Sequence, residues 1–220
     1  MVKRAAFYID GFNLYHAVDA LGEPFLKWCD LRKLGEIIIP SQTESLVSVV
    51  FCTAFYPRDQ DKKWRHMQYI AANEARGVKC VMGHYVHEEM SCRGCERTWQ
   101  KPTEKETDIN LALSLYQDAV SDVFDVAYLV TADSDQAATA RFLSENYPAK
   151  SLVTVAPPGR NFSVDISRYA QRRIALNRDH LDRCVLPKII MGDKGVVAKR
   201  PKEYEPPDWW VHPDNRPSKK

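Results

Sequence analysis

The sequence predicts an α/β fold in which helices cover both faces of a mostly parallel sheet. Five short apolar runs rich in Val, Leu, Phe and Tyr alternate with stretches whose apolar residues recur at helical spacing. Near-continuous apolar runs are typical of strands that are buried on both faces. Their alternation with helices favours a doubly wound domain, and the 220 residues suffice for one such domain with a tail.

The individual elements follow from these patterns in chain order. The apolar runs predict strands at residues 5–9, 46–55, 78–86, 126–131 and 151–156. The helical spacing predicts helices at residues 59–76, 107–120, 136–145 and 163–174. Apolar stripes on such helices ordinarily face the core, and the stripes of the first two consist of Trp64, Met67, Ile70 and Ala71, and of Ile109, Ala112, Leu113 and Tyr116.

The chain divides into a domain at residues 1–197 and a basic tail at residues 198–220, which is rich in Pro and charged residues and which we expect to be loose. The formal net charge is +2, with +3 in residues 194–220 and −1 in the remainder. This near-neutral balance excludes a highly basic, coat-like nucleic-acid binder.

No apolar run approaches the ~18–20 residues of a membrane span, and the N-terminus does not resemble a secretory signal. We therefore expect a cytoplasmic protein without a membrane partner.

Acidic residues follow two of the expected strands. Asp10 comes directly after the first strand, Asp133 and Asp135 follow the fourth, and Asp108 lies at the start of a helix. Ligands of open parallel sheets bind at the carboxyl ends of the strands, where these side chains would meet. Two carboxylates about 4 Å apart repel by roughly 4 kcal/mol at an effective dielectric near 20, so the cluster needs a cation or protonation. Carboxylate oxygens suit Mg²⁺ or Mn²⁺, which indicates phosphoryl-transfer or phosphodiester chemistry.

Each of these acids also has a purely structural explanation. Asp10 with Gly11 is a turn signal, Asp108 favours a helix N-terminus, and Asp133 or Asp135 is a helix cap. Two acidic strand ends in one α/β chain nevertheless favour a site over separate structural roles.

Three acidic motifs, in this order, resemble a known family. They are Ile9-Asp-Gly-Phe-Asn-Leu-Tyr15, Glu104-Lys-Glu-Thr-Asp-Ile-Asn-Leu-Ala112 and Tyr128-Leu-Val-Thr-Ala-Asp-Ser-Asp135. Over about residues 3–201 the chain is similar to NYN-domain proteins, the LabA-like branch of the PIN-like nuclease superfamily. The resemblance implies a PIN-like (Rossmannoid) three-layer domain with a five- or six-stranded sheet. It also implies that Asp10, Asp108, Asp133 and Asp135 are catalytic and hold the metal, and that Asn13 orients substrate or a metal-bound water.

The resemblance implies a divalent-metal-dependent (endo)ribonuclease that hydrolyses single-stranded or structured RNA, and a homodimer as one of its states.

Two positions depart from the family pattern. Gln136 stands where relatives commonly have an apolar residue, and Ala132 stands where Gly or Asn is usual. Neither departure removes a carboxylate, so we expect the site to be intact.

Two other functions compete with ribonuclease activity. A phosphatase or Toprim-like phosphotransferase also uses acids at strand ends, but a HAD-type phosphatase needs Asp-x-Asp after the first strand, where this chain has Asp10-Gly-Phe-Asn13. A non-catalytic RNA-binding module would keep the fold. The four carboxylates argue against it because acidic charge hinders the binding of phosphates.

The six cysteines indicate free thiols, because the chain shows no secretion signal. Cys92 and Cys95 form a Cys-x₂-Cys pair in an expected loop insert near residues 87–106. Such a pair supplies half of a tetrahedral zinc site, and His87 is the best-placed candidate for a further ligand. No second Cys-x₂-Cys pair is present, so structural Zn²⁺ and a reduced pair both remain open.

Four residues near strand ends are candidates for binding RNA. Arg58 and Arg160 follow strands on the acidic edge and are placed to contact phosphates. Phe12 and Tyr15 are placed to stack on bases of single-stranded RNA. The alternative for the basic residues of this region is a solvated helix face.

Overall fold

The computed structural model describes residues 2–216 and confirms the predicted α/β fold. A six-stranded sheet lies at its centre, with strand order β3-β2-β1-β6-β7-β8, and every neighbouring pair is parallel. The strands are β1 (Lys3–Asp10), β2 (Glu44–Thr53), β3 (Lys79–Met82), β6 (Val126–Val130), β7 (Ser151–Ala156) and β8 (Arg172–Ala175). Four of them correspond to predicted apolar runs, because strands buried on both faces are almost wholly apolar.

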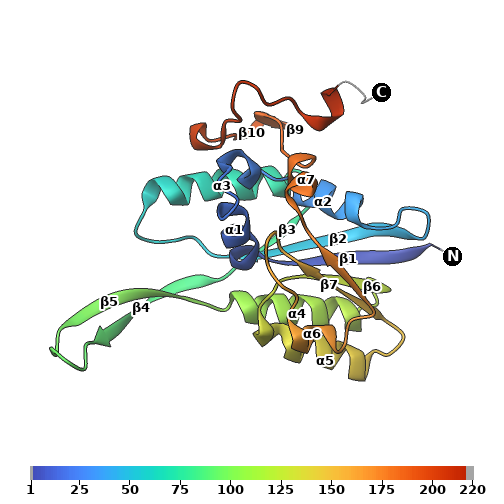
Figure 1. The fold of residues 1–220 in the computed structure, drawn as a ribbon, viewed down its shortest axis with the longest axis horizontal. Coiled ribbons are helices and arrows are strands. Elements are labelled where there is room, and N and C mark those ends of the chain that lie inside the picture. Colours follow the sequence, from blue (N-terminus) through green and yellow to red (C-terminus); the bar gives the residue numbers. More distant parts are fainter. Residues whose placement is uncertain (1, 217–220) are drawn as a thin grey trace.

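Helices cover both faces of the sheet (Figure 1), with α1, α2, α3 and α7 on one face and α4, α5 and α6 on the other. They are α1 (Gly11–Asp19), α2 (Leu31–Ile38), α3 (Gln60–Glu74), α4 (Thr107–Val120), α5 (Ala137–Asn146), α6 (Val164–Ser167) and α7 (Arg178–Asp182). Along β1, Phe7 and Ile9 pack in the core of the first face, and Ala6 and Tyr8 in the core of the second. Among residues 2–216, no helix is long and apolar enough to cross a membrane.

The predicted strand at residues 78–86 is in fact two strands that belong to different sheets. β3 ends at Met82, and β4 (His84–Ser91) leaves the body to pair with β5 (Thr98–Lys105) as an antiparallel arm. Figure 1 shows this arm projecting from the body. The change occurs at Gly83, where a Cβ atom would lie 2.6 Å from the carbonyl oxygen of Lys105. The insert near residues 87–106 is thus a hairpin with regular strand pairing rather than a loop.

The helix predicted at residues 163–174 is wrong for most of its length. Only α6 is helical, and β8 then pairs with the outer edge of β7. Arg172 at the start of β8 forms an ion pair with Glu44, and its guanidinium carbon lies 5.5 Å from the centre of the Tyr128 ring. These contacts and the backbone pairing, all with distant segments, outweigh the local helical pattern.

The buried faces of two helices also differ from the predicted ones. In α3 the residues Trp64 and Met67 are each 49% exposed. In α4 the sheet covers Leu111 and Leu115, whereas Ile109 and Leu113 are exposed. Each helix carries apolar residues on more than one face, so the spacing did not identify the face that packs on the sheet.

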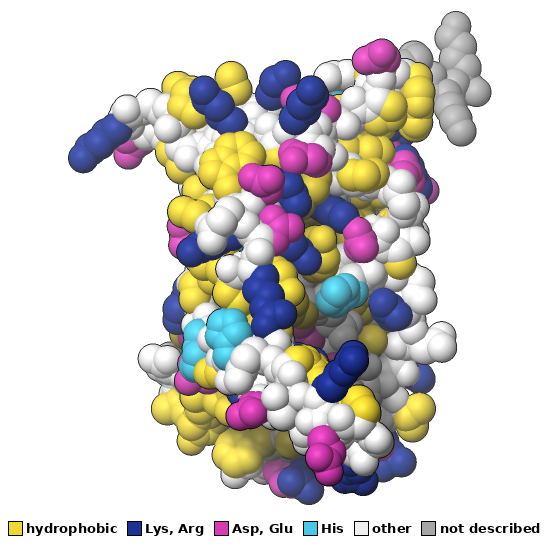
Figure 2. Space-filling model, turned by 90° about the vertical axis from the view of Figure 1, so that its left-hand side faces the viewer, with side chains coloured by type: hydrophobic (Ala, Val, Ile, Leu, Met, Phe, Trp, Pro, Cys, Tyr) yellow, Lys and Arg dark blue, Asp and Glu magenta, His cyan; other side chains and the backbone are white. Residues whose placement is uncertain are grey.

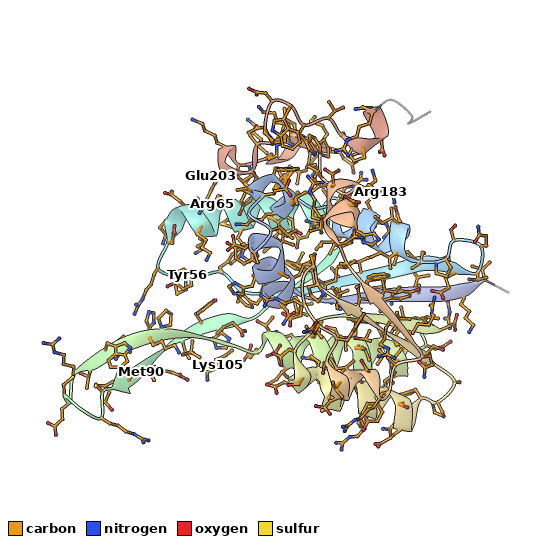
Figure 3. The ribbon with its side chains drawn as sticks, viewed as in Figure 1. Tyr56, Arg65, Met90, Lys105, Arg183 and Glu203 are labelled. Carbon is orange, nitrogen blue, oxygen red and sulfur yellow. The ribbon has the colours of Figure 1, made fainter. Side chains whose placement is uncertain are left out.

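The tail packs against the body instead of being loose. It follows a hairpin of β9 (Ile189–Gly192) and β10 (Gly195–Lys199). The Trp210 Nε1 atom donates to Asp182 at 2.6 Å, and Arg216 pairs with the same carboxylate at 2.7 Å. Arg65 of α3 pairs with Glu203 at 3.0 Å, and Figure 3 labels both residues where the tail meets α3. The last four residues of the predicted tail, 217–220, lie outside the described residues, and the boundary at residue 197 stays a prediction.

Gly11 allows α1 to begin very close to strand β2. A Cβ atom at this position would lie 2.5 Å from the carbonyl oxygen of Cys52 and 2.9 Å from the side chains of Phe51 and Thr53. No L-amino acid side chain fits there without movement of the backbone. Glycine is therefore required by close packing at the start of this helix.

We expect Gly11→Ala to lower the free energy of unfolding by about 1–3 kcal/mol, because overpacking shifts α1 away from β2. Urea unfolding of both proteins measures this change. Gly94→Ala is the matched control, because a Cβ atom at Gly94 meets no atom within 4 Å. Equal stability of the Gly11→Ala protein and the wild type would show that the close approach carries no cost.

Candidate metal and phosphodiester site

Asp10 is a buried carboxylate at the carboxyl end of the central strand β1. The residue is only 5% exposed. It accepts a hydrogen bond at 2.9 Å from the backbone N–H of Asn13, which caps α1, and another at 2.9 Å from the Thr131 hydroxyl. Thr131 directly follows β6. One carboxylate thus joins β1, α1 and the end of β6.

A cleft of about 530 Å³ opens beside Asp10. Three further acidic residues line it, namely Glu104 at the end of β5, Asp108 in the first turn of α4, and Asp133 after β6. The predicted residues Asn13 and Arg160 line the same cleft. The sheet edge and the two helices therefore bring Asp10, Asp108 and Asp133 together, as expected for carboxyl ends of parallel strands.

The electrostatics of the cleft show uncompensated negative charge. Burial, and secondarily the charges of Asp108 and Asp133, raise the pKa of Asp10 to about 6, although the hydrogen bonds from Asn13 and Thr131 act in the opposite direction. The pKa of Asp108 is also raised, first by loss of hydration and then by Asp133 and Glu104. A cation bound in the cleft would offset the repulsion between these carboxylates and lower their pKa values.

Polar contacts fix the groups around the carboxylates. The Asn13 side-chain oxygen accepts from the backbone N–H of Ala132 at 3.0 Å. Asp133 donates its backbone N–H to the Thr131 hydroxyl at 3.0 Å and accepts from the backbone N–H of Asp135 at 3.0 Å. Gln136, 2% exposed, donates to the backbone oxygen of Asp108 at 3.2 Å. The departure at Gln136 thus has a structural role, because its amide ties α4 to the end of β6.

Several predicted site residues lie outside the cleft. Asp135 is exposed and does not line it, although its charge contributes to the raised pKa of Asp108. Arg58 donates to the backbone oxygen of Gln100 on the arm instead of facing the acids. Tyr15 lines a neighbouring cavity, and Phe12 lines both spaces.

Glu104 is a site residue that sequence reasoning did not single out. It lies four residues before Asp108 in the motif quoted above, and it accepts a hydrogen bond from the backbone N–H of Thr107 at 2.9 Å. The sequence feature that could have identified Glu104 is its position in the acidic stretch that precedes the helix. Only the end of the arm at β5 places it in the cleft that Asp10 lines, where its charge acts on Asp108.

The predicted zinc ligands do not come together within one chain. Cys92 and Cys95 are free thiols at the tip of the arm. His87 is on β4, where it pairs with Pro102 of β5. Cys92 follows five residues later along this extended strand, which places it roughly 16 Å from His87. Within residues 2–216, no three His, Cys, Asp or Glu side chains are grouped so as to hold a metal ion as they stand. Zinc at Cys92, Cys95 and His87 is therefore not supported.

The acidic cleft offers carboxylate oxygens, rather than thiolates or imidazoles, as metal ligands. Its carboxylates line one space, although among residues 2–216 no three of them are grouped closely enough to hold one ion as they stand. Mg²⁺ usually keeps several waters and takes only one or two carboxylates together with substrate phosphates. An open, carboxylate-lined cleft with raised pKa values fits such a hydrated ion.

Comparisons with known proteins agree with this architecture. The model of the NYN domain family matches residues 4–177. The chain is 27% identical to 6-hydroxy-3-succinoylpyridine 3-monooxygenase HspA of Pseudomonas putida (strain DSM 28022 / S16), over 96% of this chain and 77% of that protein. It also resembles the crystal structure of VPA0982, a protein of unknown function from Vibrio parahaemolyticus, with a TM-score of 0.55 and 17% identity, over 81% of this chain and 95% of that one. The last likeness concerns the fold alone.

We expect Asp10→Asn to stabilise the protein in a chelating buffer at about pH 8 by up to about 3 kcal/mol. The folded-state pKa of Asp10 is about 6, above the value of about 3.9 in unfolded chains. The contribution of Asp10 to the free energy of unfolding should therefore fall as the pH rises from about 4 to about 6 and stay low above that pH. Asn keeps the helix cap and does not titrate.

Urea unfolding of both proteins across this pH range measures the difference. Asp193→Asn, at an exposed position, is the control and should leave the pH profile unchanged. A stability difference between Asp10→Asn and wild type that does not vary with pH would contradict the raised pKa.

Proposed function

The chain belongs to the NYN domain family, and from this membership we propose that it is a divalent-metal-dependent ribonuclease that hydrolyses RNA phosphodiester bonds. NYN domains are PIN-like and are generally nucleases. The observation that carries the proposal is the cleft in which Asp10, Glu104, Asp108 and Asp133 face one space with Arg160 beside them. The LabA-like branch, the RNA substrate and a homodimer remain predictions.

Asp10, Asp108 and Asp133 are the residues that would hold Mg²⁺ or Mn²⁺. A metal ion bound there lowers the pKa of a water molecule and neutralises charge on the phosphate. Glu104 is a further candidate ligand because it lines the same cleft. Asp135 stays in the predicted set, and its backbone N–H orients the carboxylate of Asp133.

The remaining residues of the cleft have roles in binding and positioning. Arg160 is exposed at the cleft, where its guanidinium can bind a phosphate oxygen. Asn13 is held by Ala132 through its side-chain oxygen, so its amide N–H₂ group is the part that would contact substrate. Thr131 holds Asp10 through its hydroxyl and thereby positions the buried carboxylate.

A second candidate function has one observation in its favour. The P. putida relative is named as a monooxygenase of a substituted pyridine and covers almost the whole chain. Such a reaction inserts one atom of O₂ into an aromatic ring and takes two electrons from a reduced donor. The carboxylate cluster favours the nuclease, because phosphodiester hydrolysis uses a carboxylate-held cation directly.

We expect the wild type to cleave single-stranded RNA with Mn²⁺ or Mg²⁺ and to lose the activity in chelator. Asp10→Asn and Asp133→Asn should each lower the rate about 100-fold or more, since metal binding supplies several kcal/mol of charge stabilisation. Gel analysis of a mixed RNA pool measures both effects. Asp193→Asn is the control and should retain full activity.

Parallel assays separate the competing functions. Turnover of a small phosphomonoester would indicate a phosphatase, and RNA binding without turnover would indicate a binding module. Oxygen uptake that depends on a pyridine substrate and a reduced nicotinamide or flavin would indicate the monooxygenase. Undiminished RNA cleavage by folded Asp10→Asn and Asp133→Asn proteins would refute the proposed site.

A further inference from the structure

A second cavity lies next to the acidic cleft, on the other side of the first turns of α1. Its volume is about 290 Å³, and it is bounded by α1, α3, the base of β4 and Tyr204 of the tail. Phe12 and His16 of α1 line both the cavity and the cleft, so the two spaces are neighbours. Figure 3 shows Tyr56 between α3 and the arm. The ribonuclease proposal assigns this cavity no role.

Aromatic rings from three separate elements form one wall of the cavity. The rings of Phe12 and Tyr85 are edge to face, with centres 6.3 Å apart, and those of Tyr85 and Tyr56 are edge to face, with centres 5.6 Å apart. All three residues are half-buried. Half-buried rings of this kind are the platforms on which flat guests stack in single-strand-binding proteins.

A positive charge lies at the same wall. The Lys62 Nζ atom is 5.3 Å from the centre of the Tyr56 ring and 5.4 Å from that of Tyr15. Among residues 2–216, Lys62 forms no ion pair with a carboxylate, although its charge reaches Asp19, which pairs with nearby Lys27. The Lys62 ammonium is thus placed to bind an anionic group attached to a flat ring.

His66 adds a neutral polar group to the lining. Burial, and secondarily the charge of Lys62, lowers the pKa of His66 to about 4, so its ring is uncharged at neutral pH. The ring nitrogen Nε2 lies 3.2 Å from the Thr53 hydroxyl. A neutral imidazole offers both a donor and an acceptor, as the edge of a nucleobase does.

We propose that this cavity binds one unpaired nucleobase of single-stranded RNA, with the adjoining phosphate at Lys62 and the chain continuing past Phe12 into the acidic cleft. The volume is near the lower end, about 300 Å³, of the range for ligand pockets, so it admits one ring system and no duplex. Figure 2, viewed from the side of the arm, shows Lys and Arg side chains beside apolar side chains on this face. The inference rests on the proposed ribonuclease function for the direction of the RNA chain.

The test measures RNA affinity in chelator, where no cleavage is expected. Fluorescence anisotropy of the full-length protein uses a single-stranded RNA of about ten nucleotides and the same RNA with an abasic site at each position in turn. We expect one abasic position to weaken wild-type binding about 10-fold or more, because stacking on that base is lost. In Tyr56→Ala the same abasic site should have no further effect, and Tyr56→Phe should behave as wild type.

Lys62→Ala should weaken binding of every RNA and reduce the salt slope by about one charge. Two neighbours on α3 serve as matched controls because neither lines the cavity: the exposed Trp64 and the adjacent Lys63. Trp64→Ala and Lys63→Ala should keep the abasic effect at the same position. Thermal unfolding of each variant excludes loss of fold.

Two outcomes would overturn the inference. One is equal affinity for all abasic RNAs, or an abasic effect that persists unchanged in Tyr56→Ala. The other is Tyr56-dependent binding of free pyridine-3-carboxylate without any abasic effect, which would assign the cavity to a small aromatic acid. Failure of RNA cleavage would refute the proposed function but leave the abasic result standing, so the two failures are distinguishable.

Discussion

The buried carboxylate of Asp10 is the constraint on which the rest of the site depends. The carboxyl group of a residue that is 5% exposed is costly unless it is hydrogen-bonded and its charge is compensated. Two hydrogen bonds meet the first need, one from the N-terminus of α1 and one from Thr131. They fix the direction of α1 and the position of the chain after β6. The second need, compensation of charge, is what makes the cleft a candidate cation site.

The sheet topology explains why the cleft forms at this point. β1 lies between β2 and β6, and the chain leaves these strands toward opposite faces of the sheet, to α1 and α3 on one side and to the loop before α5 on the other (Figure 1). Open α/β sheets bind ligands at such a switch point. The first turns of α1 lie between the acidic cleft and the aromatic cavity, because Phe12 and His16 line both spaces. The proposed base site and the proposed cleavage site are therefore adjacent.

Four strands of the sheet were predictable because each one coincides with a short run of apolar residues in the sequence. β1, β2, β6 and β7 are buried in a sheet with helices on both faces, which demands apolar residues at nearly every position. β8 was not predictable in this way, since it forms on the free edge of β7 and its first residue, Arg172, is held by Glu44 from β2. The faces of α3 and α4 were misassigned because each helix carries more apolar residues than the sheet can cover. Trp64 and Ile109 remain on the surface for this reason.

The sequence by itself determined the α/β alternation and two of the acids at the sheet edge, Asp10 and Asp133, because residues at or soon after the end of a parallel strand have their location set by that strand. Asp108 follows the arm, and its motif rather than a strand pointed to it. Tertiary structure decided which other groups join them. The arm brings Glu104 to the cleft, holds Arg58 through Gln100, and carries His87 away from Cys92. The aromatic cavity likewise needs α1, α3, β4 and the tail to meet. These outcomes depend on how segments far apart in the chain pack and pair with one another. No local pattern of residues specifies which of these segments come into contact.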